Sequence, residues 1–230
     1  NLLFSDPKVN DFISQWLCAY PIFQDNRVYR PYHLKHHRFT ETKDDPDLSL
    51  SAPFPIKKDS FYRKIFRDLT GITGYKRYSQ ALNSILNTEA KNSKEKLNKV
   101  WHKIHGFLIT NTIIFLMISI FFHWSLFFLL WWLPAFTYYS LIIRIRNIAE
   151  HSVTPGNNNF DNTRTTLTNP IVRFLMAPHR VNYHLEHHLF MMCPWYNLPK
   201  AHSMMIENGY EDRMCIANSY RSVLMKAVSA

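Results

Sequence analysis

The sequence predicts an all-α protein whose central part is a helical hairpin embedded in a membrane. The first observation is a run without Asp, Glu, Lys or Arg that covers the 40 residues 104–143. The second is a scarcity of glycine, with five in 230 residues, which favours helices. The third is a pair of His-x-x-His-His triplets, His33/His36/His37 and His184/His187/His188, on either side of that run. A membrane hairpin beside a metal site explains all three.

The uncharged run is long enough for two membrane spans. About 20 residues of helix cross a hydrocarbon core of about 30 Å, so 40 residues suffice for two crossings. The run divides naturally near His123, which predicts spans at about 104–122 and 126–143, with a kink at Pro134. The alternative is a hairpin buried inside a soluble protein. Soluble cores rarely contain so long an uncharged stretch, so we favour the membrane.

Flanking charge predicts how the hairpin is oriented. The chain has 27 Lys and Arg against 17 Asp and Glu, a formal charge of +10. Arg144 and Arg146 follow the run, and the turn between the spans has no Lys or Arg. Five lysines precede the run: Lys91, Lys94, Lys96, Lys99 and Lys103. The positive-inside rule therefore places both ends, and with them both triplets, on the cytoplasmic side. Nucleic acid is not an expected partner, because the basic residues cluster beside the spans and no base-reading motif is present.

The rest of the chain reads as short helices and loops. Residues 10–23 are apolar but short, which suits an interfacial helix or the end of a severed span. Residues 61–100 are predicted to form basic helices near the membrane, and residues 39–60 and 152–170 to form loops. Residues 171–230 are predicted to be helical with breaks at three prolines: Pro178, Pro194 and Pro199.

The triplets point to metal binding. Positions i, i+3 and i+4 share a helix face, so each triplet is predicted to aim its imidazoles at one point. His151, which follows the second span in an Asn147-x-x-x-His151 pattern, is a seventh candidate. Seven imidazoles exceed what one tetrahedral zinc ion uses, so they predict two ions of an imidazole-binding metal, with iron first. Iron–sulfur and disulfide chemistry are not expected from three scattered cysteines: Cys18, Cys193 and Cys215.

Nearby carboxylates are candidates for orienting these imidazoles. A carboxylate that accepts a hydrogen bond from the far nitrogen of a ligating histidine fixes its tautomer. Each candidate could equally form a turn, cap a helix or be solvated. The candidates are Asp45, Asp47, Glu150 and Glu186. Structural roles are predicted for the remaining five of the 12 histidines: His102, His105, His123, His179 and His202.

Three stretches resemble the histidine boxes of the membrane-bound fatty acid desaturases. They are His33-Leu-Lys-His36-His37, Asn147-Ile-Ala-Glu-His151 and Asn182-Tyr-His184-Leu-Glu-His187-His188. Further similar stretches lie at residues 16–23, 44–49, 163–166 and 194–199. The resemblance covers a desaturase domain at residues 1–205, and it leaves residues 206–230 as a C-terminal cytosolic extension.

The resemblance implies a four-span helical stem under a cytosolic cap that holds two iron ions (Fe2+/Fe3+). Molecular oxygen would be the co-substrate, and two hydrogens would be removed from a fatty acyl lipid. Asn147 matches a position that approaches iron through water. Electrons would come from a donor such as ferredoxin or cytochrome b5, which could dock on Arg27, Arg30, Lys35 and Arg38. The implied ligands are His33, His36, His37, His151, His184, His187 and His188.

One departure from the family pattern concerns the start of the chain. The family has an earlier His-x(3–4)-His box and a first pair of spans, and neither is present in this sequence. Residues 1–4 resemble the text that follows that box, so we expect a fragment that lacks two ligands and cannot hold a normal two-iron centre. Two other functions stay open. One is a lipid or carotenoid hydroxylase or ketolase with the same histidine boxes, and the other is a non-catalytic membrane metal-binding protein.

Overall fold

The structure is a computed structural model that describes residues 4–51, 53–156 and 158–228. Residues 1–3, on which part of the prediction about the chain's start rests, lie outside this description. The chain forms two compact units. The histidine unit comprises residues 32–64 and 142–228, and the hairpin unit comprises residues 4–31 and 65–141.

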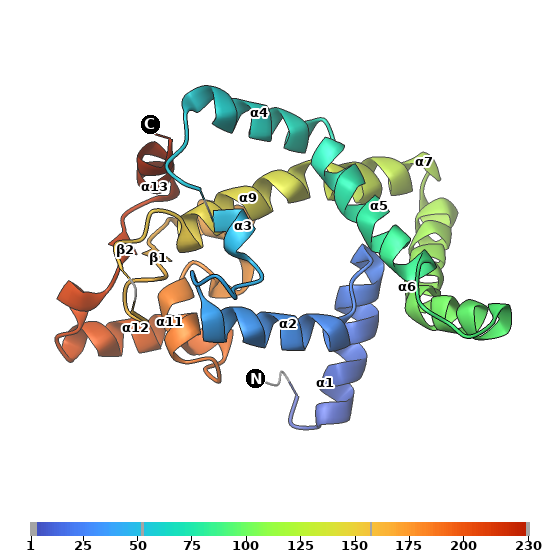
Figure 1. The fold of residues 1–230 in the computed structure, drawn as a ribbon, viewed down its shortest axis with the longest axis horizontal. Helices are drawn as coiled ribbons and strands as arrows, with labels where there is room; N and C mark the ends of the chain where they lie inside the picture. Colours follow the sequence, from blue (N-terminus) through green and yellow to red (C-terminus); the bar gives the residue numbers. More distant parts are fainter. Residues whose placement is uncertain (1–3, 52, 157, 229–230) are drawn as a thin grey trace. The chain divides into compact units, whose positions relative to one another are not determined.

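The described chain is mostly helical, as predicted (Figure 1). Its α-helices are α1 Pro7–Ile13, α2 Asn26–Phe39, α3 Leu48–Ser51, α4 Lys58–Leu69, α5 Ile72–Leu86, α6 Ser93–Phe121, α7 Ser125–Phe127, α8 Leu133–Phe136, α9 Tyr138–His151, α10 Pro170–Met176, α11 His184–Leu189, α12 Leu198–Glu207 and α13 Tyr220–Ala227. Helices α3 and the start of α4 lie in the predicted loop at 39–60. Residues 61–100 are largely helical, as predicted, and their last residues already belong to α6.

Two long helices are apolar enough to cross a membrane. They run from Ser93 to Phe121 and from Ser125 to His151, with mean hydropathies of 2.0 and 1.7 over their most apolar windows. Only 17% of each window is buried within the protein, so most residues of these windows are at least partly exposed. The predicted spans 104–122 and 126–143 fall almost entirely within these helices. Exposed apolar side chains suit a lipid environment better than the core of a soluble protein.

The second apolar helix is interrupted around Pro134, where the sequence predicted a kink. A π-helical turn covers Phe128–Trp132, and Thr137 leaves helical geometry between α8 and α9. Proline has no N–H to donate to the preceding turn, so the ladder of hydrogen bonds breaks here. The Arg77 guanidinium of α5 donates to the Ala135 carbonyl at 2.8 Å, which satisfies an acceptor beside the break.

Residues 10–23 pack against α6 rather than standing alone. Helix α1 continues through a π-helical turn and a 3-10 turn, Tyr20–Ile22. The Tyr20 ring occupies the space that a side chain at position 106 would need, so glycine is required there for the close approach. Asn111, a polar residue within an apolar helix, donates from Nδ2 to the Pro21 carbonyl at 3.1 Å. These contacts fix the segment to the first apolar helix.

The histidine unit contains a short parallel strand pair that the all-α prediction missed. Strand β1, Thr165–Thr166, pairs with β2, Ile216–Ala217, and Thr165 also forms a bridge to Tyr183 just before α11. Two residues per strand are too few to show a period-2 pattern, so the sequence offered no strand signal. A second correction concerns Pro199, which does not break a helix. It lies in the first turn of α12, where its missing N–H costs nothing.

Candidate metal centre

The seven predicted histidines come together in the histidine unit, in two groups. The first group is His36, His151, His184 and His188, and the second is His33, His37 and His187. Within each group the candidate ligand atoms all lie within 4.8 Å of one another. The two groups are neighbours, because the rings of His37 and His188, one from each group, stack with centroids 4.0 Å apart.

Each triplet divides between the two groups, which corrects the prediction that a triplet aims at one point. In an α-helix, residues i and i+4 differ by about 40° around the axis, whereas i+3 lies about 60° away on the other side. His33 and His37 therefore point together, and His36 points to the other group. The second triplet does the reverse, since His184 and His188 join His36 and the i+3 residue His187 joins the first pair. Each group thus takes ligands from both α2 and α11.

The nitrogen atoms are spaced as ligands of a common ion would be. In the three-histidine group, the Nε2 atoms are 3.1 Å apart for His37 and His33, 3.1 Å for His37 and His187, and 3.3 Å for His33 and His187. Imidazole nitrogens about 2.1 Å from one metal ion would be about 3.0 Å apart in an octahedron and about 3.4 Å apart in a tetrahedron. The observed spacings fall within that range, so this group fits a metal ion.

The four-histidine group has the same spacing. His184 Nε2 lies 2.9 Å from His151 Nε2 and 3.1 Å from His188 Nε2. A neutral imidazole has one N–H, so convergent ring nitrogens cannot all satisfy one another by hydrogen bonds. Nε2 atoms that converge in this way are explained if their lone pairs serve a cation.

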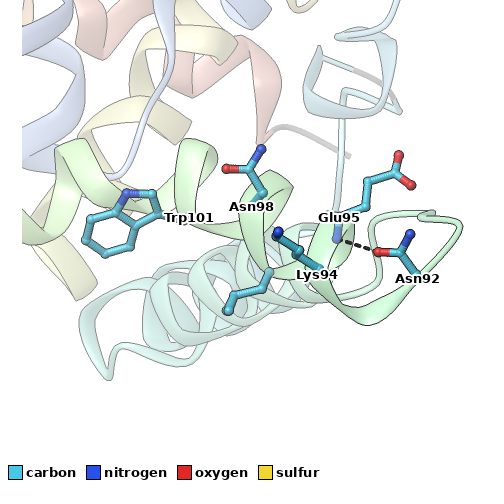
Figure 2. A pocket seen from close by; sticks show the side chains of 6 residues that line it. Asn92, Lys94, Glu95, Asn98 and Trp101 are labelled. Atoms are coloured by element: carbon cyan, nitrogen blue, oxygen red, sulfur yellow. Dashed lines mark hydrogen bonds between the residues drawn. The ribbon is translucent and has the colours of Figure 1, made fainter.

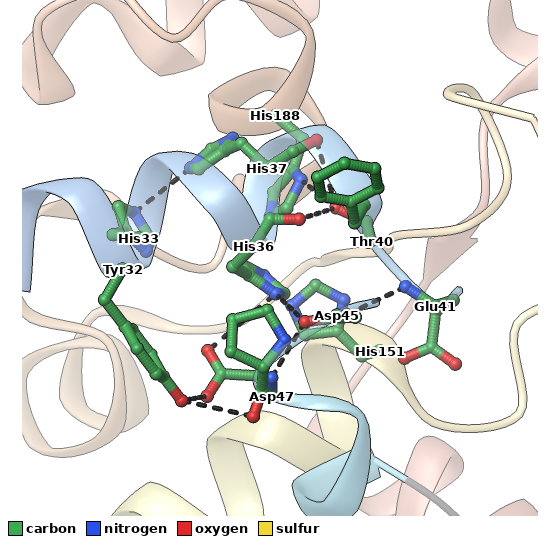
Figure 3. Close-up of polar contacts among 12 residues, drawn as sticks. Tyr32, His33, His36, His37, Thr40, Glu41, Asp45, Asp47, His151 and His188 are labelled. Atoms are coloured by element: carbon green, nitrogen blue, oxygen red, sulfur yellow. Dashed lines mark hydrogen bonds and ion pairs between the residues drawn. The ribbon is translucent and has the colours of Figure 1, made fainter. Parts of the chain in front are cut away.

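Asp45 orients His36 from a turn that follows α2. Its Oδ1 accepts a hydrogen bond from His36 Nδ1 at 2.8 Å, with both side chains buried (Figure 3). The same carboxylate accepts from the backbone N–H groups of Glu41 and Asp47, each at 2.8 Å. Because Nδ1 of His36 donates to Asp45, Nε2 is the nitrogen left to bind a metal ion. This arrangement is the one predicted for a tautomer-fixing carboxylate.

Thr40 is a site residue that the sequence analysis missed. Its hydroxyl donates to the His36 carbonyl at 2.8 Å, one helical turn back, and it lies 3.2 Å from His188 Nδ1. With its hydrogen directed to the carbonyl, the oxygen accepts from Nδ1–H of His188, which leaves Nε2 of that ring for metal. The threonine lies four residues after His36, on the triplet's face, and this spacing was the available signal.

Glu186 does not orient a metal-facing histidine directly, in contrast to its prediction. Its Oε1 accepts from His202 Nδ1 of α12 at 2.6 Å, and its Oε2 accepts from the Thr165 hydroxyl of β1. Glu186 is fully buried. Helix α11 has only six residues, too few to be stable alone, so this network holds it between β1 and α12. His202, predicted as structural, supports the second triplet in this way.

Replacing Glu186 with alanine should therefore act through the position of α11. The change leaves two buried donors unpaired, each at a cost of about 1–3 kcal/mol of stability. We expect metal affinity to fall by about 10–100-fold. Glu186→Gln should be milder, because its amide oxygen keeps one acceptor. The measurements are thermal unfolding and metal affinity, with exposed Glu207→Gln as the control. Unchanged affinity in the alanine variant would contradict this role.

The other residues predicted to support the histidines, Glu150, Asp47 and Asn147, differ in what they contact. Glu150 pairs with Arg146 one turn earlier on α9, at 3.1 Å, rather than forming a hydrogen bond with a histidine. Asp47 Oδ2 lies 3.7 Å from His36 Nδ1, and its Oδ1 accepts from the Tyr32 hydroxyl at 2.6 Å (Figure 3). Asp47 therefore supports the turn more than the ring. Asn147 is partly buried on α9, one turn before His151.

Burial keeps six of the seven metal-facing imidazoles uncharged at neutral pH, His36 being the exception. It lowers the pKa of His33 and His187 to about 4 and that of His37 to about 3, and neighbouring imidazoles add to the effect. Burial also lowers the pKa of His184 and His188. For His36, burial lowers the pKa, but the hydrogen bond and charge of Asp45 outweigh it, so the pKa is raised. Neutral imidazole is the form that binds metal.

The metal-free protein should therefore lose stability as the pH falls. Histidines of the unfolded chain become protonated below pH 6.5, the ordinary pKa of histidine. In the folded chain His33 and His187 become protonated only at about pH 4, so the unfolded state binds more protons between these two values. The unfolding temperature of chelator-treated protein should fall across that window. His37→Asn should make the fall shallower, because one such histidine is gone. An equally steep fall in this variant would contradict the assignment.

Two hollows in the described chain lie apart from the seven histidines. One, of about 640 Å³, lies along the first turns of α6 around Trp101 (Figure 2). There Asn92 caps the helix by accepting from the Glu95 backbone N–H at 2.8 Å. The other, of about 470 Å³, lies beside β2 and includes Arg164 and Lys226. The guanidinium of Arg164 donates to the Ala149 and Val153 carbonyls, so it also secures the end of α9 that carries His151.

Comparison with known proteins agrees with this geometry. Residues 1–216 of the 230 match the family model described as "Fatty acid desaturase". No curated protein and no solved structure shows a significant match. The family match includes all seven histidines and the residues that hold them, and it extends beyond residue 205, where the predicted resemblance ended. Family membership implies an oxidoreductase, and a helical protein with two groups of buried or half-buried imidazoles accords with it. The chain belongs to the fatty acid desaturase family.

Proposed function

We propose that this protein is an oxygen-dependent, di-iron acyl-lipid desaturase that introduces a C=C double bond into a fatty acyl chain. The observation that carries the proposal is the pair of adjacent all-imidazole groups, each built from both triplets. Iron bound there would supply the redox chemistry with dioxygen that an unactivated C–H bond requires, which no side chain can supply. The reaction removes two hydrogen atoms from adjacent carbons. Dioxygen is reduced to two waters with two further electrons and two protons.

The residues of the chain have defined tasks in this proposal. The seven imidazoles provide the ligands, and burial leaves every one of them except His36 with a lowered pKa, which keeps those six rings deprotonated at neutral pH. Asp45 and Thr40 hold Nδ1–H of His36 and His188, which keeps Nε2 of both rings directed at the ion. The Glu186–His202 pair holds α11 in place. Placement of this kind matters because small displacements of ligands or substrate cost large factors in rate.

Membrane insertion is the second part of the proposal. The two long helices would cross the bilayer at about residues 104–122 and 126–143, as part of a four-span stem beneath a cytosolic cap. Their hydropathy and exposed apolar side chains support this. The flanking lysines and arginines support a cytoplasmic position for both ends and for the metal centre. An acyl lipid from the same membrane would then be the substrate.

The electrons would come from an acidic redox protein such as ferredoxin or cytochrome b5. Lys35 and Arg38 are exposed on α2, the helix that carries the first triplet, and they favour an acidic partner. Arg27 and Arg30 are also exposed, and Arg30 pairs with Asp11 at 3.2 Å. Such surface contacts would raise the rate of docking more than its strength, and they would weaken with salt.

Product analysis under labelled oxygen tests the proposed reaction. Membranes containing the protein would be supplied with acyl lipid, an electron donor and ¹⁸O₂, and the lipid products analysed by mass spectrometry. A desaturase yields a product two hydrogens lighter that contains no label. A hydroxylase or ketolase yields an ¹⁸O-labelled product, which would contradict the proposal. Metal binding without oxygen consumption would indicate the non-catalytic alternative.

A further inference from the structure

Helix α10 packs beside α9 close to the proposed membrane surface. Its inner residues Val172 and Met176, like Ile145 of α9, pack against a buried cluster that includes Ala149 of α9. The proposed second span ends at about residue 143. At 1.5 Å per residue, Ile145 and Ala149 lie about 3 and 9 Å beyond it along the same helix. If the span crosses the membrane as proposed above, α10 lies at the level of the lipid headgroups.

The outer face of α10 is apolar and exposed. Ile171, Phe174 and Leu175 are 73%, 81% and 58% exposed, and their spacing of three and four residues places them on one side of the helix. The short helix thus has an apolar inner side that is packed and an apolar outer side that no described residue covers. Contiguous exposed apolar side chains usually mark a protein or membrane contact.

Aromatic side chains extend this face. The His179 ring, just after α10, meets the edge of Trp195 with centroids 5.2 Å apart. Trp195 and the neighbouring Tyr196 are 39% and 57% exposed. Tryptophan and tyrosine are enriched where membranes meet water, because their rings have an apolar body and a polar edge.

The charge of the face distinguishes a membrane from other apolar partners. Residues 167–206 contain Arg173, Arg180 and Lys200 but a single acidic residue, Glu186. Glu186 is fully buried, so the surface of this segment carries positive charge only. An apolar face with basic residues and no exposed carboxylate suits the anionic phospholipids of the cytoplasmic leaflet.

We propose that α10, together with Trp195 and Tyr196, lies in the headgroup region of an anionic bilayer as an interfacial element, which we call the membrane seat. Only residues 177–183 separate α10 from His184, so the seat would set the height of α11 and its ligands above the membrane. An acyl chain leaving the bilayer beside α10 would then have a fixed distance to travel to the metal centre. The inference rests on the proposed membrane insertion, and its test separates the two.

Quenching of site-specific fluorophores tests the seat. The full chain, with Cys18, Cys193 and Cys215 replaced by alanine, would be placed in vesicles of phosphatidylcholine and phosphatidylglycerol. A single labelled cysteine would be introduced by Phe174→Cys, by Ile120→Cys on exposed apolar α6, or by Glu211→Cys on an exposed acidic turn. The label at position 174 should be quenched by nitroxides attached near the lipid headgroup and protected from aqueous iodide. The label at 211 should show the reverse, with a several-fold difference for each quencher.

The possible results separate the membrane seat from the membrane insertion on which it rests. If the label at 120 is quenched by nitroxides deep in the bilayer while that at 174 is quenched by iodide, the seat is wrong and membrane insertion stands. If the label at 174 is protected from both quenchers, protein covers this face, and the seat is again wrong. If lipid nitroxides reach neither label, membrane insertion fails and the seat fails with it.

Discussion

Replacing His187 with alanine in a full-length version of the protein is expected to abolish the double-bond product while the protein still inserts into the membrane. The change removes one of the three imidazoles in the His33/His37/His187 group. Losing a ligand should cost more than the roughly 10–100-fold typical of losing an outer hydrogen-bond partner. Product would be measured by mass spectrometry of extracted lipids and iron by elemental analysis. His102→Ala, on the exposed side of α6, is the matched control. Wild-type turnover in the His187 variant would refute the ligand assignment.

The division of the triplets makes this test sharper. His37 and His187 are 150 residues apart in the sequence but belong to one group, whereas His37 and His184 belong to different groups. Combining His37→Ala with His187→Ala should remove little more metal than either change alone, because both affect one ion. Combining His37→Ala with His184→Ala should remove metal from both groups. Equal metal loss in the two double variants would contradict the division into groups.

Replacing Asp45 with alanine is expected to have the largest effect of any change outside the seven histidines. The carboxylate accepts three hydrogen bonds, from His36 Nδ1 and from the backbone of Glu41 and Asp47. Its loss frees the His36 ring to rotate and leaves buried donors unpaired, each costing about 1–3 kcal/mol. Metal affinity should fall by about 10–100-fold, with a similar loss of product. Metal titration and turnover measure the two effects separately.

Two companion variants interpret the Asp45 result. Asp44→Ala changes the exposed neighbour and should leave metal affinity unchanged. Asp45→Asn keeps one oxygen for His36 but turns an amide donor toward the N–H of Glu41 or Asp47, so it should fall between the wild type and Asp45→Ala. If asparagine and alanine give the same affinity, the hydrogen bond to His36 does not carry the effect. A loss of metal affinity in Asp44→Ala would indicate that the conformation of the whole turn, and not the Asp45 carboxylate alone, controls metal binding.

The helices and the histidines that gather into two groups could be predicted because their signals are local. An uncharged run at residues 104–143 and a His-x-x-His-His spacing are visible without any knowledge of the fold. The interruption near Pro134 followed from the chemistry of proline alone. Strands β1 and β2 could not be predicted, because two-residue strands stabilised by a partner 51 residues away leave no pattern in the chain.

Partners that are distant in the sequence account for the remaining errors. Asp45, which follows His36 closely in the sequence, does form a hydrogen bond with that ring. Glu186 was assigned to the imidazoles beside it on α11, yet its partner is His202 of the next helix. Thr40 was overlooked because its hydroxyl contacts His188, a residue that is distant in the sequence and is brought close only by the fold. The hydrogen-bond partners of these side chains depend on how the helices pack against one another.

The sequence by itself determined that this protein has two membrane-length apolar helices and seven histidines in patterns typical of metal ligands, because hydropathy and helical spacing are properties of consecutive residues. Only the tertiary structure decided how those histidines divide. Helical geometry separates the i+3 residue from its i and i+4 neighbours, but the choice of partner depends on how α2, α9 and α11 pack. Only the tertiary structure also showed that the outer face of α10 is exposed, because an apolar pattern in the sequence is equally typical of a buried helix.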